Sequence, residues 1–301
     1  MSLKDELRAA ARRVGLDEIG TCSAVSWPEM AHQAQWFAMG CHGKLDYLRR
    51  RERIRFDPTL FSPGARSVVM VAKAYPSQRV EPARHPIIAR YARLKDYHLA
   101  LGAALNALLA VIRSWGHRGR AFVDGAPIME KVMASRCGLG VIGTHSLLIH
   151  PVWGSYVVLG GIITDAEFPE ETEDRGPRGC QGCQACVKAC PMNAIQMPGY
   201  VDARRCLSCW NVEGQDIPAQ EIPPLGRQRL FGCDICQEVC PMNQERPPVD
   251  ARFFGGVVED SWSEDRWLSA TPEEFAQTWG DTPLGRCGLE NIQSRIRQII
   301  S

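Results

Sequence analysis

The spacing of the cysteines constrains this chain more than any other feature of its sequence. Nine of its 13 cysteines lie between positions 180 and 240. The first four read C-x2-C-x2-C-x3-C and are Cys180, Cys183, Cys186 and Cys190. In bacterial ferredoxins this spacing holds [4Fe–4S] clusters, with three cysteines on one cluster and the fourth on the other. The pattern therefore predicts two neighbouring clusters.

A second run repeats this motif without its first cysteine. It reads C-x2-C-x3-C before a proline and consists of Cys233, Cys236 and Cys240. Leu230 occupies the position of the missing cysteine. Two clusters need eight thiolates, whereas the two runs supply seven. The eighth must come from Cys206 or Cys209, which lie between the runs.

The fourth cysteine of each run is expected to cross to the other cluster. We therefore assign to one cluster the residues Cys180, Cys183, Cys186 and Cys240. We assign to the other cluster Cys190, Cys233, Cys236 and either Cys206 or Cys209.

Cysteine-rich segments also occur in zinc ribbons and in disulfide frameworks. Zinc sites commonly pair two C-x2-4-C knuckles around four ligands, and a crossed fourth cysteine has no role there. Disulfides belong to oxidising compartments. The start MSLKDELRAAARR indicates an amphipathic helix rather than a signal peptide. The spacing thus favours clusters, and we expect a reducing, cytoplasmic location.

Length and composition indicate a globular protein with more than one domain. The chain has 301 residues, of which 45% are hydrophobic and 23% charged, so it can bury a large core. We expect two domains and a tail. No apolar run approaches the length of a membrane span, so we expect no membrane partner.

The net charge of +1 conceals an asymmetry between the two parts of the chain. Residues 1–136 hold 22 Lys and Arg against 12 Asp and Glu, and the remaining residues hold 13 against 22. A basic half is compatible with a polyanionic partner, with a small anionic ligand or with a solvated surface. Charge alone does not separate these three interpretations.

Hydrophobic periodicity predicts an α/β domain in the first part of the chain. Helices are expected over residues 2–14, 27–39 and 88–115. Strands are expected over residues 16–24, 67–72, 120–124 and 154–165. Residues 167–179 are acidic and contain proline, which is typical of a linker. The later part of the chain predicts a helix that begins at Thr271 and a final amphipathic helix over residues 288–300.

Asp124 stands at the end of the strand expected over residues 120–124. A carboxylate in this position is a common feature of catalytic sites in α/β folds. Aspartate is also a common helix cap, and on the residues alone capping is the simpler interpretation. The nearby Gly138, Gly140 and Gly143 follow a helix rather than a strand, so they do not indicate a dinucleotide site.

Two neighbouring clusters form a path for electrons, which a second redox site must accept or pass on. The first 170 residues are too many to serve only as a holder for clusters, so we expect the electron acceptor there. The cysteines outside the cluster segment are expected to be ordinary buried thiols; they are Cys22, Cys41, Cys137 and Cys287.

Several separate segments resemble the epoxyqueuosine reductases, which are cobalamin-dependent enzymes related to reductive dehalogenases. The resemblance runs from about position 36 to position 243. It is carried by RFDPTLFSPGARSVVMVAKAYP, IARYARLKDYH, FVDGAPIMEKVMASRCGLGVIG and GSYVVLGGIITD, and by VDARRC and FGCDICQEVCP in the cluster segment. Because these segments occur in the same order, the match is more specific than the ferredoxin motif alone.

The resemblance implies a fold and a division into domains. Residues 1–170 would form a nitroreductase-like α/β (α+β) domain that binds cobalamin. Residues 171–248 would form a ferredoxin-like domain with two [4Fe–4S] clusters, and residues 249–301 a short helical tail. We expect a monomer that receives electrons from a reduced flavodoxin or ferredoxin-type donor.

The resemblance also implies roles for individual residues. It makes Cys206 the eighth cluster ligand, and it makes Asp124 the proton donor rather than a helix cap. We expect a partly apolar pocket to keep the Asp124 carboxyl protonated. Cobalamin contacts carried over by position, in addition to Asp124, are Arg55, Ser208, Asp234 and Ile235.

Three departures from the family pattern concern the substrate side. Thr144 stands where the family usually has lysine, and Met242 stands where it has tryptophan. Many members also continue past position 301 into helical repeats that help to hold the tRNA. The leading hypothesis is reduction of epoxyqueuosine in the anticodon region of tRNA. The alternatives are a cobalamin-dependent reductase of a small molecule, and a ferredoxin-like electron carrier whose N-terminal half only docks partners.

Overall fold

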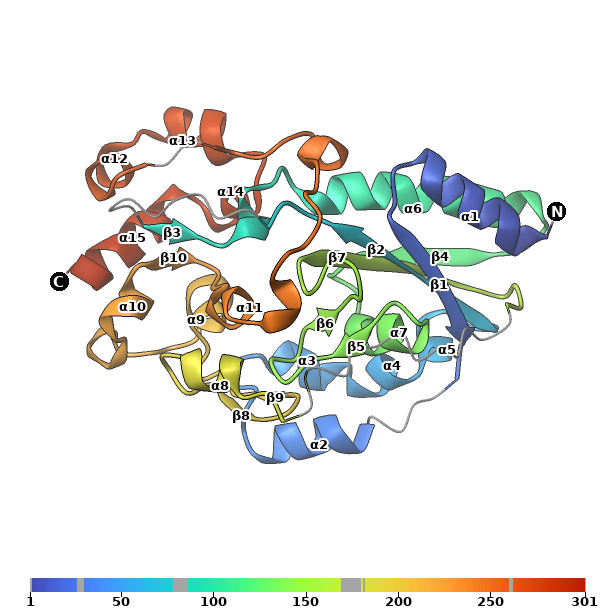
Figure 1. Cartoon of the computed structure of the whole chain (residues 1–301), viewed down its shortest axis with the longest axis horizontal. Coiled ribbons are helices and arrows are strands. Elements are labelled where there is room, and N and C mark those ends of the chain that lie inside the picture. Colours follow the sequence, from blue (N-terminus) through green and yellow to red (C-terminus); the bar gives the residue numbers. More distant parts are fainter. Residues whose placement is uncertain are drawn as a thin grey trace.

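The computed structural model describes residues 2–25, 30–77, 86–168, 180, 182–259 and 262–300. Its N-terminal half is built on a four-stranded antiparallel sheet with the order β1-β2-β7-β4 (Figure 1). The strands are β1 (Glu18–Ser23), β2 (Ser67–Ala74), β7 (Val157–Thr164) and β4 (Gly119–Phe122). All four correspond to strands expected from the sequence, and the mixed α/β class is confirmed.

The central strand β2 separates two hydrophobic cores. All of its residues are buried, and alternate side chains of a strand point to opposite faces of the sheet. Val69 and Val71 pack into one core, whereas Val68, Met70 and Ala72 pack into the other. The continuous apolar run of this segment thus reflects a strand that is covered on both faces.

Helices cover both faces of the sheet (Figure 1). Helices α1 (Leu3–Arg13) and α6 (Tyr97–Ser114) lie on one face, and α7 (Glu130–Arg136) lies on the other. Helix α6 is long and apolar enough to cross a membrane by length and composition alone. Its residues Leu101, Leu105 and Leu108 are fully buried against α1 and the sheet, as in the core helix of a globular domain.

The single long helix expected over residues 88–115 is wrong at its beginning. The structure instead has β3 (Ile87–Ile88), a 3-10 turn η1 (Arg90–Arg93), and α6, which begins at Tyr97. The Asp96 side chain accepts a hydrogen bond from the backbone N–H of His98 and so caps α6. The chain before α6 is extended because β3 pairs with β10 (Arg229–Phe231) of the cysteine-rich segment. A contact distant in sequence therefore overrides the local helical pattern.

Shorter elements complete the N-terminal half. They are α2 (Met30–Ala38), α3 (Asp46–Arg50), α4 (Glu52–Phe56), α5 (Pro58–Phe61), β5 (Val141–Ile142) and β6 (Leu148–Ile149). The arginine-rich segment forms the short helices α3 and α4, and four of its five arginines are exposed, as expected. The first residues of the helix expected over 27–39 and most of the expected linker, residues 169–179, lie outside the described residues.

The cysteine-rich segment folds into small elements around its two cysteine runs. These are α8 (Ala185–Ala189), β8 (Ile195–Met197), β9 (Tyr200–Val201), α9 (Leu207–Glu213), α10 (Pro224–Arg227), β10 and α11 (Ile235–Glu238). Helices α8 and α11 pack against each other, and each contains one cysteine of its run, Cys186 in α8 and Cys236 in α11. The buried amide of Asn211 on α9 donates to the carbonyls of Arg229 and Gly232 and accepts from the N–H of Gly232. This clamp fixes α9 beside the second run.

The C-terminal part of the chain packs onto this assembly. Its helices are α12 (Glu264–Ser269), α13 (Pro272–Trp279), α14 (Pro283–Cys287) and α15 (Leu289–Ile300). They enclose Trp262, Trp267 and Trp279 in one core with Ile88 of β3 and Phe231 of β10. The predicted helix start at Thr271 is confirmed as a capping box with Glu274.

Two leucines of α6 provide a matched test of this packing. Leu105 is fully buried, whereas Leu99 is 77% exposed on the same helix. We expect Leu105→Ala to lower the free energy of unfolding by about 2–5 kcal/mol, because it leaves a cavity in the core. Leu99→Ala should change it by less than about 0.5 kcal/mol. Urea unfolding followed by circular dichroism under anaerobic conditions measures both; equal effects would contradict the placement of α6.

Candidate cluster and active site

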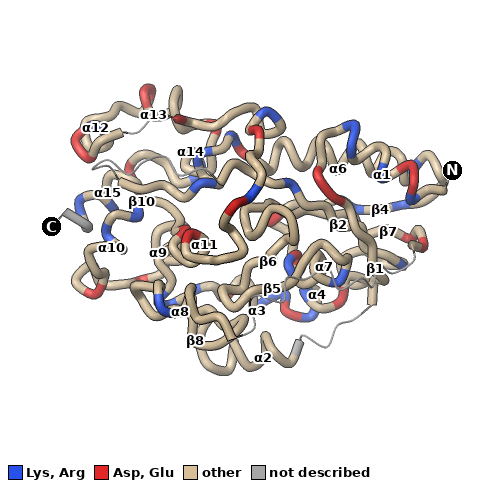
Figure 2. Tube along the Cα trace, in the orientation of Figure 1, with Lys and Arg blue, Asp and Glu red and all other residues tan. Residues whose placement is uncertain are grey.

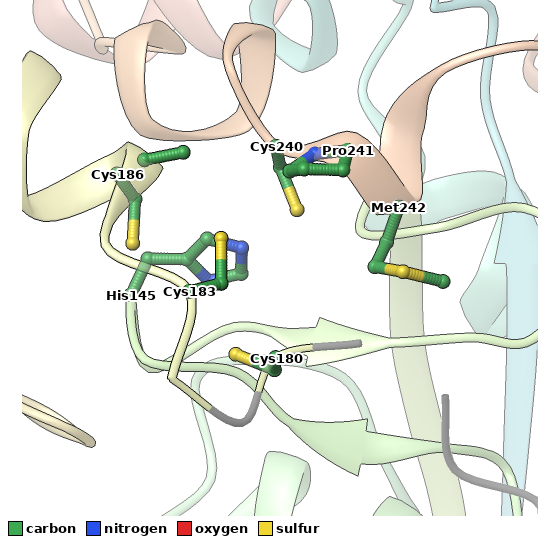
Figure 3. A pocket seen from close by; sticks show the side chains of 8 residues that line it. His145, Cys180, Cys183, Cys186, Cys240, Pro241 and Met242 are labelled. Atoms are coloured by element: carbon green, nitrogen blue, oxygen red, sulfur yellow. The ribbon is translucent and has the colours of Figure 1, made fainter. Parts of the chain in front are cut away.

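The two cysteine runs meet around one pocket. Figure 3 shows four cysteine side chains around a common space, together with the imidazole of His145. The four are Cys180, Cys183, Cys186 and Cys240. The last of them comes from the second run and directly follows α11. The structure therefore brings together the four residues that the crossed spacing assigned to one cluster.

The remaining predicted ligands lie in a second group. Burial raises the pKa of the Cys236 thiol, and the nearby thiols of Cys233 and Cys206 raise it further. Cys190 follows α8 and packs with Cys233 against the same small hydrophobic cluster. The structure thus places Cys190, Cys206, Cys233 and Cys236 as half-buried neighbours.

The two groups of four cysteines have the number of ligands that two [4Fe–4S] clusters need. Two ligands bound at about 2.3 Å from one zinc ion lie at most about 4.6 Å apart. Among the described residues, no group of three or more His, Cys, Asp or Glu side chains converges closely enough to hold one ion. Eight cysteines in two groups are compatible with two iron–sulfur clusters, which are larger than a single metal ion.

The positions of Cys206 and Cys209 favour Cys206 as the eighth ligand. Cys206 lies at the beginning of α9, and its thiol raises the pKa of both Cys233 and Cys236. Cys209 donates to Cys206 and thereby lowers the pKa of the Cys206 thiol. The charge neighbours of Cys209 include Glu213 and Lys131. Cys209 thus lies between the second cysteine group and the region of Asp124.

Thr144 and His145 contact the first cysteine group from the turn between β5 and β6. The backbone N–H of Thr144 donates to the Cys180 sulfur at 3.3 Å, and its hydroxyl lies 3.3 Å from the same sulfur. His145 is 5% exposed, and burial lowers its pKa to about 4, with a further contribution from the charge of Lys131. The departure at Thr144 therefore lies beside a predicted cluster ligand.

Asp124 lies in a loop between β4 and α7. Its backbone has φ +51°, which is unusual for a residue other than glycine. Its backbone N–H donates to the Glu130 carboxylate at 2.6 Å. Helix α7 begins at Glu130, with Met129 as its N-cap residue, so Asp124 does not cap it. The capping interpretation is wrong.

Tyr97 and His98, from the first turn of α6, hold the Asp124 carboxylate. The Tyr97 hydroxyl donates at 3.0 Å, and His98 Nε2 lies 3.4 Å from the same carboxylate oxygen. The other ring nitrogen of His98 lies 2.7 Å from Asp96, whose carboxylate is 3.8 Å from Arg286 of α14. Arginine, aspartate, histidine and aspartate thus form a continuous row that begins in the C-terminal helices.

This row determines how Asp124 titrates. The hydrogen bond from His98 lowers the pKa of Asp124, burial opposes this change, and Tyr97 lowers the pKa further. The same hydrogen bond, with that of Asp96, raises the pKa of His98 above its ordinary 6.5. The expectation that an apolar pocket keeps Asp124 protonated is therefore wrong for this structure. The same hydrogen bonds favour the protonated form of His98.

Two further titratable groups of α7 lie beside Asp124. Burial raises the pKa of Glu130 to about 8, and the charge of Asp124 contributes in the same direction. Lys131 is exposed, but partial desolvation lowers the pKa of its ammonium group. The Asp124 side chain is 63% exposed. Solvent, and hence a substrate, can reach a carboxylate surrounded by perturbed groups.

The other residues expected to contact cobalamin differ in their availability. Arg55 donates from Nη2 to the sulfur of Met129, and its buried Nε has no hydrogen-bond partner. Ser208 lies in the first turn of α9, between Cys206 and Cys209. Asp234 and Ile235 are buried, and the Asp234 carboxylate accepts from Arg90 and Gln237. A contact from Asp234 to a cofactor would therefore use its backbone.

Some residues of the site are absent from the sequence-based prediction. Tyr97, His98, Glu130 and Arg286 were not singled out. Tyr97 and His98 lie within the matched segment IARYARLKDYH, and Glu130 lies within FVDGAPIMEKVMASRCGLGVIG, so these segments held a usable signal. Arg286 lies outside every matched segment, and only the folded chain brings it to Asp96.

A second cavity borders the loop that carries Asp124. Its volume is about 460 Å³. It is lined by the arginines Arg51 and Arg120, by apolar side chains that include Phe61, and by residues on both sides of Asp124 in the loop. The Arg120 guanidinium lies 3.9 Å from the centre of the Phe61 ring. Cationic and aromatic groups thus lie together next to the candidate active site.

Comparison with known proteins gives two family matches. Residues 55–125 match the model described as Epoxyqueuosine reductase QueG, DUF1730. Residues 179–243 match the model of the 4Fe-4S double cluster binding domain. The two matches cover the segment that contains Asp124 and the segment that contains the two cysteine runs.

Whole-chain relatives agree with these matches. An epoxyqueuosine reductase of Pseudomonas aeruginosa is 32% identical over 96% of this chain and 82% of its own length. One of Leadbetterella byssophila is 32% identical over 97% and 96%. One of Aliivibrio fischeri is 34% identical over 76% of this chain, but the match spans only 63% of that relative.

Solved structures of the same enzymes superpose on this chain. A crystal structure of epoxyqueuosine reductase with a tRNA-Tyr epoxyqueuosine-modified tRNA stem loop has a TM-score of 0.85 and 27% identity, and covers 99% of this chain and 80% of that one. A Bacillus subtilis epoxyqueuosine reductase, whose catalytic aspartate loop is swung out of the active site, also has a TM-score of 0.85, with 26% identity, and covers 99% of this chain and 81% of that one.

The two cysteines of α9 provide a test of the ligand assignment. We expect the anaerobically reconstituted protein to hold about eight irons and Cys209→Ser to keep them, whereas Cys206→Ser should lose about four, because it removes one thiolate from the second cluster. Iron and acid-labile sulfide analysis, with electron paramagnetic resonance of the reduced protein, measures this. Retention of both clusters in Cys206→Ser and loss of one in Cys209→Ser would reverse the assignment.

Proposed function

The chain belongs to the epoxyqueuosine reductase family, and we propose that it reduces epoxyqueuosine to queuosine in tRNA with the help of bound cobalamin. The observation that carries this proposal is the exposed Asp124 carboxylate, which Tyr97 and His98 hold within the segment that matches the family model. A crystal structure of a relative contains an epoxyqueuosine-modified tRNA stem loop, which supports the choice of substrate.

The reaction removes one oxygen atom from an epoxide. It requires two electrons and two protons, and it yields an alkene and one molecule of water. The protein must therefore receive electrons, bring them to the substrate and provide protons to the departing oxygen. The two cysteine groups are suited to electron transfer, and the row of Arg286, Asp96, His98 and Asp124 is suited to proton supply.

The cysteine groups are suited to hold two [4Fe–4S] clusters. The first cluster would be held by Cys180, Cys183, Cys186 and Cys240, and the second by Cys190, Cys206, Cys233 and Cys236. Such clusters supply one-electron transfer, and a reduced flavodoxin or ferredoxin is a suitable donor. The match to the double-cluster domain over residues 179–243 supports this part of the proposal.

The residues near Asp124 are compatible with a bound cobalamin. The buried Nε of Arg55 lacks a partner, and a buried N–H without an acceptor is unfavourable unless a ligand supplies one. Arg55, Ser208 and the backbone of Asp234 and Ile235 would hold the cofactor. Bound cobalamin supplies the reducing chemistry at the substrate carbon.

Asp124 and His98 provide the proton for the oxygen that leaves. Asp124 would receive a proton from His98 and pass it to the substrate alkoxide, because its carboxylate is the member of the row that solvent reaches. The Asp96 carboxylate accepts the Nδ1 proton of His98 and so keeps the ring oriented, and Arg286 lies 3.8 Å from this carboxylate. The Bacillus subtilis relative has a catalytic loop, named by an aspartate, that is swung out of the active site, and this supports a role for the Asp124 loop.

The surface near the site is suited to a polyanion. The exposed arginines of α3, of α4 and of the position between them form a basic segment (Figure 2), and Arg51 lines the second cavity together with residues on both sides of Asp124. These arginines are Arg49, Arg50, Arg51 and Arg53. Lys and Arg that contact phosphates supply much of the affinity for nucleic acid. An electron carrier with a docking domain would need neither this surface nor the perturbed groups around Asp124.

Incubation with tRNA tests the proposed function. The reconstituted protein, with cobalamin and a chemical reductant, is incubated with tRNA from cells that lack epoxyqueuosine reductase, and the nucleosides are analysed by mass spectrometry. We expect queuosine to replace epoxyqueuosine, and Asp124→Asn to slow this by about 100-fold or more while cobalamin still binds by absorbance. Absence of cobalamin binding would refute the reductase; binding without loss of the epoxide would refute the tRNA substrate.

The pH dependence of the reaction tests the role of His98. Because the pKa of His98 is raised above 6.5, its proton is present at lower pH and is lost as the pH rises through this higher value. We expect the single-turnover rate to fall with rising pH, and His98→Gln to abolish this fall and slow the reaction. Glu130, with a pKa of about 8, also loses a proton as the pH rises above neutral. Glu130→Gln is therefore the control: if it abolishes the fall and His98→Gln does not, the proton comes from Glu130.

A further inference from the structure

His145 lies in the wall of the first cysteine group. It follows Thr144 in the turn between β5 and β6, and it lines the same pocket as the cysteines of both runs (Figure 3). Gly143 makes room for the ring, since a Cβ at this position would lie 2.9 Å from His145 Cε1. Packing within the protein therefore fixes the position of the His145 ring.

The hydrogen bonds of the ring determine where its proton lies. The backbone N–H of Leu147 donates to His145 Nδ1 at 3.2 Å. An atom that accepts a hydrogen bond carries a lone pair, so Nδ1 has no proton and the ring proton lies on Nε2. This atom is buried and has no partner in the protein. A buried N–H without an acceptor costs about 1–3 kcal/mol, so such groups are rare in native proteins.

We propose that His145 Nε2–H donates a hydrogen bond to a sulfur of the [4Fe–4S] cluster held by Cys180, Cys183, Cys186 and Cys240. This inference rests on the clusters of the proposed function and adds the group that tunes one of them. The neighbouring backbone N–H of Thr144 already donates to the Cys180 sulfur. Two adjacent residues of one turn therefore direct hydrogen-bond donors at the same cluster.

The hydrogen bond changes the reduction potential of this cluster. Reduction adds one electron, taken from the external donor, and makes the cluster more negative. A hydrogen-bond donor stabilises the more negative state and so raises the potential. No proton moves, because Nε2 carries its proton before and after the transfer. His145 thus favours residence of the electron on the first cluster.

Substitution of His145 with measurement of both potentials tests this inference. The variants are His145→Leu, which fills similar space without a donor, and His145→Gln, which retains an N–H donor. We expect His145→Leu to lower the equilibrium constant for reduction of one cluster about tenfold. This corresponds to a reduction potential lower by about 59 mV for one electron. His145→Gln should give a smaller change. Redox titrations of the reconstituted protein, followed by electron paramagnetic resonance, measure both clusters.

Two further measurements identify the cluster and avoid dependence on folding of the variant. In the Cys206→Ser background, which should retain only the first cluster, the His145→Leu change must persist. In the unsubstituted protein, electron–nuclear double resonance should detect an exchangeable proton coupled to the reduced first cluster. Wild-type potentials in His145→Leu with eight irons bound, or absence of this proton, would overturn the inference. Neither outcome would contradict the proposed reductase function. Failure of the protein to bind any cluster would refute that function itself.

Discussion

The two parts of this structure depend on a buried group of charges around Asp234. Arg90, which follows β3, donates from its backbone N–H and its guanidinium to the Asp234 carboxylate, and its guanidinium also reaches Glu238. Glu238 is paired in addition with the buried Arg229. Loss of one partner from such a network costs about 3–5 kcal/mol, because a charge is left buried and unpaired. Asp234 and Glu238 lie among the cysteines of the second run, so this network fixes the run against the N-terminal domain.

The same network explains which parts of the fold could be predicted from the sequence. The strands and α1 follow from local periodicity, and the two cysteine groups follow from spacing, since ligand patterns are short-range features. The beginning of α6 could not be predicted in this way, because residues 87–93 are extended or form a tight turn only through their contacts with β10 and Asp234. The low pKa of Asp124 has a similar origin: it depends on His98, which lies 26 positions earlier and reaches Asp124 only after α6 packs on the sheet.

The C-terminal helices, which were expected to form only a short tail, contact residues of the candidate active site. They enclose three tryptophans against β3 and β10, and the backbone carbonyl of Asp281 accepts a hydrogen bond from the N–H of Asp96. Arg286 approaches both Asp96 and His98. The orientation of His98 therefore depends on residues that lie outside both family-model matches. Packing of the final helices is coupled in this way to the chemistry proposed for Asp124.

The proposed crossed ligation has a consequence for how the protein is made. Cys240 is grouped with Cys180, Cys183 and Cys186, and Cys190 lies with the second group. With this ligand set, the second group is complete only when Cys236 has been synthesised, and the first only when Cys240 has been synthesised. The N-terminal sheet, whose strands all precede the first cysteine run, can fold during translation. Insertion of iron and sulfide would then follow, so the N-terminal sheet can form before the proposed electron path is complete.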